Sequence, residues 1–289
     1  MLDVTNVQVM KNLLSEYGFH FSKSKGQNFL TQRWVPRRIC EESGVDVSCG
    51  VVEIGPGFGP LTQELCLRAK KVLALEVDTT LKPILQETVG EFDNLEILFT
   101  DALKVDLPAL VEEKLSGLRP MACANLPYYI TSPVLTKLLE SRCFSSVTVM
   151  VQKEVALRIC AKPSTADYSA FTVFCNYYAV PDLLFDVPAG CFMPQPKVTS
   201  AVLHLKTRQE PPADIPDEAL FFRVVRAAFA QRRKTLLNTL SAAFGSTGKQ
   251  ALTEILESCG ISPTVRGETL GIEEFATIAK AMKKHALEL

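Results

Sequence analysis

The stretch VVEIGPGFGPLT at residues 51–62 decides the fold of this chain. A short β-branched run leads into glycines at alternate positions, Gly55, Gly57 and Gly59, and then into a helical pattern. Glycine is needed where a chain turns tightly and its backbone approaches a ligand closely. The stretch therefore predicts a strand, a tight turn and a helix, although a turn that binds nothing explains it equally well.

Outward from this stretch, short apolar runs alternate with helical patterns. Strands are predicted at 51–54, 72–77, 95–99, 121–124 and 147–151. Helices are predicted between them, at 61–69, 81–89 and 134–139. This alternation predicts right-handed crossovers and a doubly wound, Rossmann-like α/β sheet. Two later runs, 171–180 and 198–206, are predicted to be strands at an antiparallel edge of the same sheet.

The end of the chain has a different character. Residues 207–217, TRQEPPADIPD, are polar and hold three prolines, which is typical of a linker. Beyond them, helices are predicted at 220–240, 249–259 and 272–287. We therefore expect an α/β domain over residues 1–208 and a small all-helical domain over residues 209–289.

Composition excludes several classes of protein. Apolar residues make up 47% of the chain, and glycine plus proline make up 15 + 17 = 32 of 289 residues, which excludes collagen-like and disordered chains. The net charge of −1 creates no global field for polyanions, although charge can be segregated locally. Nine cysteines without a Cys-x-x-Cys pair indicate free thiols in a reducing compartment, and no metal is expected. No targeting signal or membrane-spanning run is evident, so we expect a soluble cytoplasmic protein without a membrane partner.

Acidic residues follow the glycine turn at the ends of the next predicted strands. Glu76 stands 21 residues after Gly55, where an acidic side chain accepts hydrogen bonds from the ribose of an adenosine ligand. Asp78 is the alternative for this role, and Asp101 is placed to accept from the adenine amino group. Dinucleotide folds use Gly-x-Gly-x-x-Gly, whereas here the third glycine comes one residue early. That spacing suits a ligand without phosphates, such as S-adenosylmethionine.

The fourth predicted strand runs into Asn125-Leu126-Pro127-Tyr128. A proline turn whose tyrosine packs on the sheet edge explains this segment without any function. Its position at the carboxyl end of a central strand, where doubly wound folds place their chemistry, favours a functional one.

This segment resembles the Asn/Asp-x-Pro-Tyr signature of amino-methyltransferases. Five further segments resemble one family within that class, the small-subunit rRNA adenine N6-dimethyltransferases of bacteria, which are related to the erythromycin-resistance rRNA methylases. They are KGQNFL at 25–30, the segment 53–62, QKEVA at 152–156, F-x-P-x-P-K-V-x-S at 192–200 and FAQRRKTL at 229–236. The resemblance spans about residues 20–240 in the expected order.

The resemblance implies an S-adenosylmethionine-dependent enzyme that dimethylates N6 of two adjacent adenines near the 3′ end of small-subunit rRNA, in the assembling 30S subunit, as a monomer. It implies a cofactor site formed by Asn28, Leu30, Gly55, Gly57, Glu76, Asp101, Ala102 and Asn125. It assigns the target adenine to Asn125 and Tyr128, with Phe192 as a second aromatic wall. We expect the amide oxygen of Asn125 and the backbone carbonyl of either Leu126 or Pro127 to accept the two hydrogens of the adenine N6. Tyr129 departs from the family pattern, because many members carry Asn there.

RNA binding requires a positive surface, which the net charge conceals. No acidic residue occurs from Ala219 to Thr253, a segment that holds Arg223, Arg226, Arg232, Arg233, Lys234 and Lys249. A solvated helical face usually mixes charges, so we predict RNA phosphate contacts here. A second basic group flanks the N-terminal motif and consists of Lys23, Lys25, Arg33, Arg37 and Arg38.

Three other functions fit the sequence less well. A resistance methylase that acts on large-subunit rRNA is disfavoured by the long helical C-terminal region. An assembly factor that binds rRNA without catalysis is disfavoured by the intact Asn125–Tyr128 motif, although such a protein can keep it. A nicotinamide oxidoreductase is disfavoured by the glycine spacing.

Overall fold

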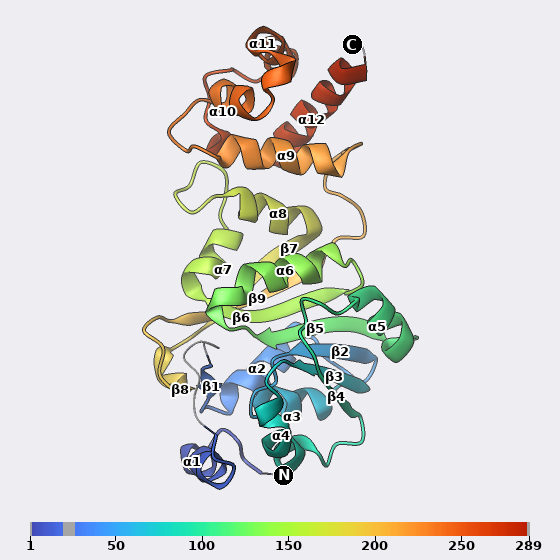
Figure 1. Cartoon of the computed structure of the whole chain (residues 1–289), viewed down its shortest axis with the longest axis vertical. Coiled ribbons are helices and arrows are strands. Elements are labelled where there is room, and N and C mark those ends of the chain that lie inside the picture. The colour runs from blue at the N-terminus through green and yellow to red at the C-terminus, as the bar shows by residue number, and fades with distance from the viewer. Residues whose placement is uncertain (1, 20–26, 288–289) are drawn as a thin grey trace. The chain divides into compact units, whose positions relative to one another are not determined.

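The computed structural model describes residues 2–19 and 27–287. The chain forms two compact units, which are coloured along the sequence in Figure 1. The first comprises Met1–Ala156 and Pro181–Thr207, and the second comprises Leu157–Val180 and Arg208–Leu289. The division differs from the single expected boundary at residue 208, because the segment Leu157–Val180 belongs to the second unit.

A seven-stranded sheet is the centre of the first unit, in the order β4-β3-β2-β5-β6-β9-β7. Strands β4, β3, β2, β5 and β6 run parallel to one another, and β9 runs antiparallel to β6. The strand order reverses between β2 and β5, as in doubly wound folds, so the predicted Rossmann-like class is confirmed. The strands are β2 (Cys49–Ile54), β3 (Lys71–Glu76), β4 (Leu95–Phe99), β5 (Arg119–Asn125), β6 (Ser146–Gln152), β7 (Ala179–Val187) and β9 (Ser200–Thr207).

Helices connect these strands, and a small ladder lies outside the sheet. Strand β1 (Phe29–Leu30) pairs antiparallel with β8 (Phe192–Met193), and the two lie side by side in Figure 1. The helices are α1 (Val7–Glu16), α2 (Trp34–Ser43), α3 (Pro60–Cys66), η2 (Thr79–Leu81), α4 (Lys82–Val89), α5 (Leu107–Leu115), η3 (Tyr128–Ile130), α6 (Thr131–Glu140), α7 (Lys153–Ile159) and η4 (Ala189–Cys191). Helix α7 begins in this unit and ends in the second one, because the first segment of this unit ends at Ala156.

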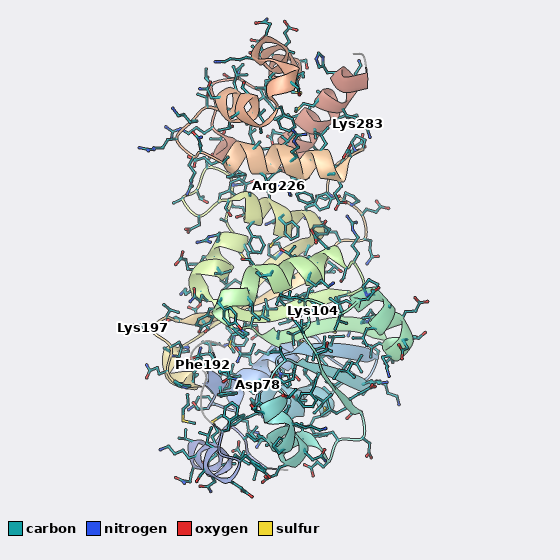
Figure 2. The ribbon with its side chains drawn as sticks, viewed as in Figure 1. Asp78, Lys104, Phe192, Lys197, Arg226 and Lys283 are labelled. Carbon is teal, nitrogen blue, oxygen red and sulfur yellow. The ribbon has the colours of Figure 1, made fainter. Side chains whose placement is uncertain are left out.

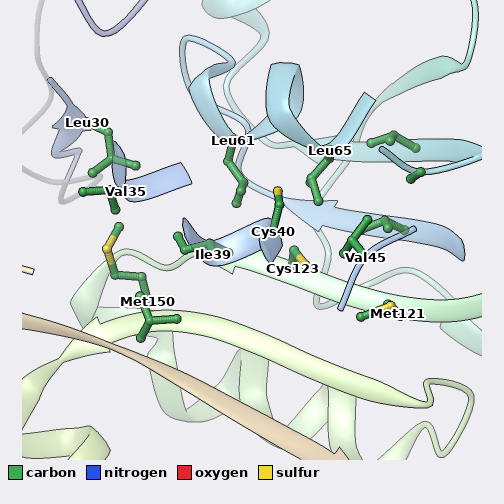
Figure 3. Close-up of a cluster of buried hydrophobic side chains, with 14 of the residues drawn as sticks. Leu30, Val35, Ile39, Cys40, Val45, Leu61, Leu65, Met121, Cys123 and Met150 are labelled. Carbon is green, nitrogen blue, oxygen red and sulfur yellow. The ribbon is translucent and has the colours of Figure 1, made fainter. Parts of the chain in front are cut away.

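The core of this unit lies between the sheet and its helices. All six residues of β2 are buried, which is expected for a parallel strand covered on both faces. Figure 3 shows Ile39 and Cys40 of α2 in one apolar cluster with Cys123 of β5 and Met150 of β6. The cysteines of this cluster are free thiols that pack as small apolar side chains.

The second unit is helical. Its helices are α8 (Ala170–Tyr178), α9 (Glu218–Phe229), α10 (Leu236–Ala243), η5 (Gly245–Thr247), α11 (Lys249–Ser258), η6 (Gly267–Thr269) and α12 (Ile272–Leu287). The strand predicted at 171–180 is wrong over most of its length, because α8 occupies it. Ser169 and Thr172 form a reciprocal capping box at the start of this helix, and Val173 and Tyr177 are buried at helical spacing.

The helix predicted at 220–240 is two helices. α9 ends at Phe229 and α10 begins at Leu236, so the basic residues Arg232, Arg233 and Lys234 lie in the connecting loop. Four consecutive exposed polar residues, Gln231–Lys234, offer no apolar side chain to bury, and the helical pattern lapses there. Within residues 2–19 and 27–287, no helix combines the length and the apolar character needed to cross a membrane.

We expect Gly59→Ala to lower the free energy of unfolding by at least about 2 kcal/mol. Gly59 precedes α3 with a φ of +88°, and a Cβ there would lie 2.6 Å from Cγ1 of Val89, a stiff buried side chain. Gly44→Ala is the matched control, because Gly44 has a φ of +71° and a Cβ added there would meet no atom within 4 Å. Urea unfolding should show a loss of only about 1 kcal/mol for Gly44→Ala; equal losses in the two variants would contradict the steric argument.

Candidate active site

A cavity lies at the carboxyl ends of strands β2 to β5, with an empty volume of about 1110 Å³ that is partly open to solvent. Parallel strands bring these ends to one edge of the sheet, where doubly wound folds bind ligands. Figure 2 labels two of the lining side chains, Asp78 and Phe192. Every residue that the sequence assigned to the cofactor or the adenine lines this cavity: Asn28, Leu30, Gly55, Gly57, Glu76, Asp101, Ala102, Asn125, Leu126, Pro127, Tyr128 and Phe192.

The glycine turn forms one wall of the cavity. Gly55 and Gly57 have φ angles of +69° and +61°, in the left-handed region that glycine adopts readily. A Cβ at Gly57 would lie 3.0 Å from Cε1 of Phe29, so the aromatic ring packs directly against the backbone of the turn. The turn thereby keeps its backbone accessible and brings residues 27–30 to the cavity.

Glu76 is the better placed of the two acidic candidates after β3. Its buried carboxylate accepts hydrogen bonds from the backbone N–H of Asp78 (2.8 Å) and of Gly57 (3.4 Å). Burial raises the pKa of Glu76, and these backbone hydrogen bonds partly oppose that rise. The Asp78 carboxylate already accepts from Nε2 of Gln27 (3.0 Å) and from the backbone N–H and hydroxyl of Thr80. This geometry favours Glu76 over Asp78 as the residue with acceptor capacity for a ligand.

The walls that follow β3 and β4 combine a carboxylate with apolar side chains. Asp101 is partly exposed and accepts a hydrogen bond from the backbone N–H of Leu103 (3.0 Å). Val77 and Leu103, which the sequence analysis missed, also line the cavity and are 65% and 36% exposed. Apolar side chains exposed at a cavity wall are suited to the faces of a planar ring. The sequence could have indicated Val77 and Leu103, because they closely follow Glu76 and Asp101 at the ends of predicted strands.

Glu53 is a buried acid that the sequence analysis did not assign. It lies within β2, is 1% exposed and lines the cavity. Burial raises the pKa of Glu53 to about 8, with Thr62 lowering it and Glu76 raising it to smaller extents. Its Oε2 has no hydrogen-bond partner among the residues that the structure describes. An acidic residue inside an otherwise apolar buried strand was the signal that could have identified it.

Asn125 ends β5 with a defined amide orientation. Its Nδ2 donates a hydrogen bond to the backbone carbonyl of Asn28 (3.3 Å). Because the amide oxygen lies on the other side of the side chain, it is left to accept from a ligand in the cavity. This hydrogen bond therefore joins Asn28 of the segment at 25–30 to the Asn-Leu-Pro-Tyr motif.

The two carbonyl oxygens after Asn125 differ in availability. The Pro127 carbonyl accepts from the backbone N–H of Ile130 (3.2 Å) and the hydroxyl of Thr131 (3.4 Å). The Leu126 carbonyl has no hydrogen-bond partner within residues 2–19 and 27–287. The sequence left both carbonyls open as acceptors, and this geometry favours Leu126.

Two aromatic side chains line the cavity near Asn125. Tyr128 is half-buried, and its hydroxyl lies 2.8 Å from Oγ of Ser200. Burial raises the pKa of Tyr128, and the bond to Ser200 opposes that rise. Phe192 is 5% exposed and is held by the pairing of β8 with Leu30 of β1. Within the described part of the chain, no group of three or more His, Cys, Asp or Glu side chains is arranged to hold a metal ion.

The predicted basic residues of the second unit have different surroundings. Arg223 lies over the ring of Phe244 (4.3 Å to the centroid) and donates to the Ala243 carbonyl, so it stabilises the end of α10. Arg232 pairs with Glu268 (2.9 Å). Three exposed residues have no ion pair among the described residues: Arg226, labelled in Figure 2, Arg233 and Lys234.

The second predicted basic group is largely compensated by acids. Arg37 pairs with Glu41, Arg38 pairs with Glu42, and Arg33 lies 3.8 Å from Glu64. The predictions for Lys23 and Lys25 fall outside the described residues.

We expect Glu53→Gln to remove a pH dependence of folding. The pKa of Glu53 rises from an ordinary 4.5 to about 8, so the folded state retains a proton that the unfolded state has lost. The contribution of this group is therefore full below about pH 4.5 and is lost as the pH rises through about 8. Between about pH 5 and pH 8, the variant should gain at least about 1 kcal/mol of stability relative to the wild type, measured by urea unfolding.

The exposed Glu113, whose side chain is 71% accessible, provides the control for that measurement. Glu113→Gln should follow the wild-type pH profile. Parallel profiles for wild type and Glu53→Gln would show that Glu53 titrates normally.

Comparison with known proteins identifies the family. The family model described as ribosomal RNA adenine dimethylase matches residues 18–284. "Ribosomal RNA small subunit methyltransferase A" of Geobacillus kaustophilus (strain HTA426) is 46% identical over 284 residues, which cover 97% of each chain. The protein of the same name from Bacillus cereus (strain B4264) is 44% identical over 291 residues, covering 99% of this chain and 100% of that protein.

Solved structures show the same fold. A dimethyladenosine transferase from Plasmodium falciparum has the same fold, with a TM-score of 0.77 and 23% identity over 89% of this chain and 98% of that one. The 23S rRNA methyltransferase ErmE has a TM-score of 0.67 and 25% identity over 89% of this chain and 100% of that one. The chain belongs to the ribosomal RNA adenine dimethylase family.

Proposed function

We propose that this protein transfers methyl groups from S-adenosylmethionine to N6 of two adjacent adenines near the 3′ end of small-subunit rRNA. We further propose that it acts as a monomer on the assembling 30S subunit in the cytoplasm. The names of relatives that are 44–46% identical support the substrate. The observation that carries the proposal is a single cavity lined by the glycine turn, Glu76 and the Asn125–Tyr128 turn.

The polar groups that line the cavity suit the cofactor. S-adenosylmethionine supplies a methyl group bonded to a positively charged sulfur. Two buried carboxyl groups, Glu53 and Glu76, line the cavity. Burial raises the pKa of Glu53 to about 8, and a cationic ligand beside its unpartnered Oε2 would favour the ionised form. Glu76 would accept hydrogen bonds from the ribose hydroxyls, and Asp101 would accept from the adenine amino group. The remaining residues proposed to enclose the cofactor are Asn28, Leu30, Gly55, Gly57, Ala102 and Asn125.

Asn125 and Leu126 would prepare the nucleophile. N6 of adenine is a poor nucleophile because its lone pair is delocalised into the ring. If Oδ1 of Asn125 and the Leu126 carbonyl accept its two hydrogens, the lone pair turns out of the ring plane toward the methyl group. Pro127 contributes mainly by shaping the turn, since its carbonyl is already engaged. Such positioning can lower the barrier by several kcal/mol without a strongly basic side chain.

Tyr128 and Phe192 would bind the target base. An adenine must leave its stack to enter the cavity, and aromatic faces replace the stacking that it loses. Each ring is expected to contribute about 1–3 kcal/mol if it stacks on the base. After transfer, the N6 cation is strongly acidic and loses its proton to water. The second methylation requires the monomethylated N6 to bind again with its methyl group turned away.

The basic residues of the second unit would bind the RNA backbone. The loop between α9 and α10 presents Arg233 and Lys234 to solvent, with Arg226 nearby in sequence on α9. Such contacts orient the RNA without reading its sequence. Arg232 and Arg223 are also proposed to contribute, although each has a protein partner.

We expect Asn125→Ala to slow methylation of purified small-subunit particles by at least about a hundredfold, the loss typical of one positioned polar group. Phe192→Ala should lose about 1–3 kcal/mol of stacking while particle binding through phosphates persists. Single-turnover transfer of labelled methyl, followed by mass spectrometry for dimethyladenosine, measures both effects.

Large-subunit particles serve as the substrate control in that assay. Labelling of large-subunit rather than small-subunit rRNA by the wild type would overturn the proposed substrate. A near-normal chemical step in Asn125→Ala would overturn the amine-positioning mechanism.

We expect Arg233→Glu combined with Lys234→Glu to weaken small-subunit binding by at least about tenfold and to reduce the slope of its salt dependence by about 2. Cofactor affinity should not change, because every residue that lines the cavity belongs to the first unit. Lys280→Glu with Lys283→Glu on α12 makes the same charge change at residues already bonded to Asp214 and to the Pro216 carbonyl. Equal losses in the two double variants would show that only net charge matters.

A further inference from the structure

One hydrogen bond joins the aromatic wall of the cavity to the central sheet. The hydroxyl of Tyr128 lies 2.8 Å from Oγ of Ser200, 72 residues later in the chain. Ser200 is 0% exposed and does not line the cavity, so it is not a contact residue for a ligand. It is the single described hydrogen-bond partner of the Tyr128 hydroxyl.

Ser200 is held rigidly on the sheet. It is the first residue of β9 and lies opposite Gln152 in the antiparallel ladder with β6. The backbone N–H of Lys153 donates a hydrogen bond to the carbonyl of Thr199 (3.0 Å), and this bond fixes the residue before Ser200. The backbone of Ser200 is thus fixed by the sheet, and its hydroxyl is a fixed hydrogen-bond partner for the Tyr128 hydroxyl.

The same segment carries Phe192, the second aromatic residue of the cavity. Phe192 lies eight residues before Ser200, and its backbone is paired with Leu30 in the β1–β8 ladder. Tyr128 follows β5, which is a different neighbour of β6. The bond between Tyr128 and Ser200 therefore ties the turn after β5 to the segment that ends the Phe192 wall.

We propose that Ser200 is a positioning residue for methyl transfer, whose hydroxyl holds the Tyr128 ring in the orientation that stacks on the target adenine opposite Phe192. This inference rests on the proposed role of Tyr128 in binding the base. A ring free to rotate about its side-chain bonds binds the base in several orientations, of which only some present N6 to the methyl group. The bond should therefore affect the rate of transfer more than the affinity for either substrate.

A second side-chain hydrogen bond to β9 separates positioning from general support of the sheet. The hydroxyl of Thr148 on β6 lies 2.8 Å from Nδ1 of His204 on β9. Neither residue lines the cavity. Loss of this pair should affect stability without affecting methyl transfer.

The test is a double-mutant cycle in single-turnover methylation, with saturating S-adenosylmethionine and small-subunit particles. Ser200→Ala and Tyr128→Phe each remove the bond, and each should slow transfer by about 3- to 10-fold, the value of one partly buried hydrogen bond. The double variant should be no slower than the slower single variant, since the bond can be lost only once. Cofactor and particle dissociation constants should stay within about twofold of the wild type, because neither change alters a proposed cofactor or phosphate contact.

Control variants make each outcome decisive. Thr148→Val should methylate at the wild-type rate, and a loss equal to that of Ser200→Ala would assign the effect to the sheet and overturn the inference. Multiplying losses in the double variant would also overturn it, because the two residues would then act independently. If thermal unfolding shows that Ser200→Ala does not fold, Tyr128→Phe breaks the bond from the other side, and a wild-type rate in that variant overturns the inference.

Tyr128→Ala distinguishes failure of this inference from failure of the proposed function. A loss in Tyr128→Ala with normal rates in Tyr128→Phe and Ser200→Ala would retain the stacking role and reject only the positioning role. A normal rate in Tyr128→Ala would reject base stacking by Tyr128 and the inference with it.

Discussion

The ring of Phe29 rests against the backbone of Gly57, and the cavity depends on that contact. A side chain at Gly57 would meet the ring at 3.0 Å and displace it. Phe29 is also packed against Phe58 and Phe19, with ring centroids 4.4 Å and 6.2 Å away. This cluster fixes β1, and β1 in turn pairs with the strand that carries Phe192. The absence of a side chain at Gly57 therefore allows residues 27–30 to line the cavity.

The parallel sheet explains why distant motifs converge. Parallel strands end at one edge, so the residues that follow β2, β3, β4 and β5 necessarily meet there. The bond from Asn125 to the Asn28 carbonyl then couples this edge to the N-terminal segment. One side chain thus contacts the part of the cavity proposed for the cofactor and the part proposed for the adenine. Under the proposed function, this single amide would contact both substrates.

The parts of the structure that the sequence predicts depend on local patterns of residues, and the parts that it does not predict depend on contacts between distant residues. The central strands could be predicted because burial on both faces requires continuous apolar runs, as in β2. The prediction of a strand at 171–180 failed because β-branched and aromatic residues suit a buried helix as well as a strand. The capping box at Ser169 favours the helix. The break after Phe229 was hidden because the apolar pattern resumes at Leu236.

The site shows the same limit. Residues that follow strands were assigned to the cofactor or the adenine from their strand-end positions and from the family motifs, and the structure brings them together at one cavity. Ser200 was quoted within a motif but given no role, since its partner is 72 residues away. The surroundings of Arg223 were equally hidden: its guanidinium lies over Phe244, which no pattern of charge in the sequence reveals. Side-chain contacts that depend on tertiary packing cannot be predicted from the residues around each partner in the sequence.

The two sides of the cavity differ in how firmly they are built. The strand-end residues on one side continue from a sheet whose neighbouring strands share ladders of five or six residue pairs. The β1–β8 side has two residue pairs, extended by the Thr31 N–H bond to the Cys191 carbonyl. The free energy of local opening follows the number of such interactions, so backbone amides of β1 should exchange with solvent before those of β5. We therefore expect any widening of the cavity to occur at the β1–β8 ladder, while the amide and carbonyl acceptors at the end of β5 keep their places.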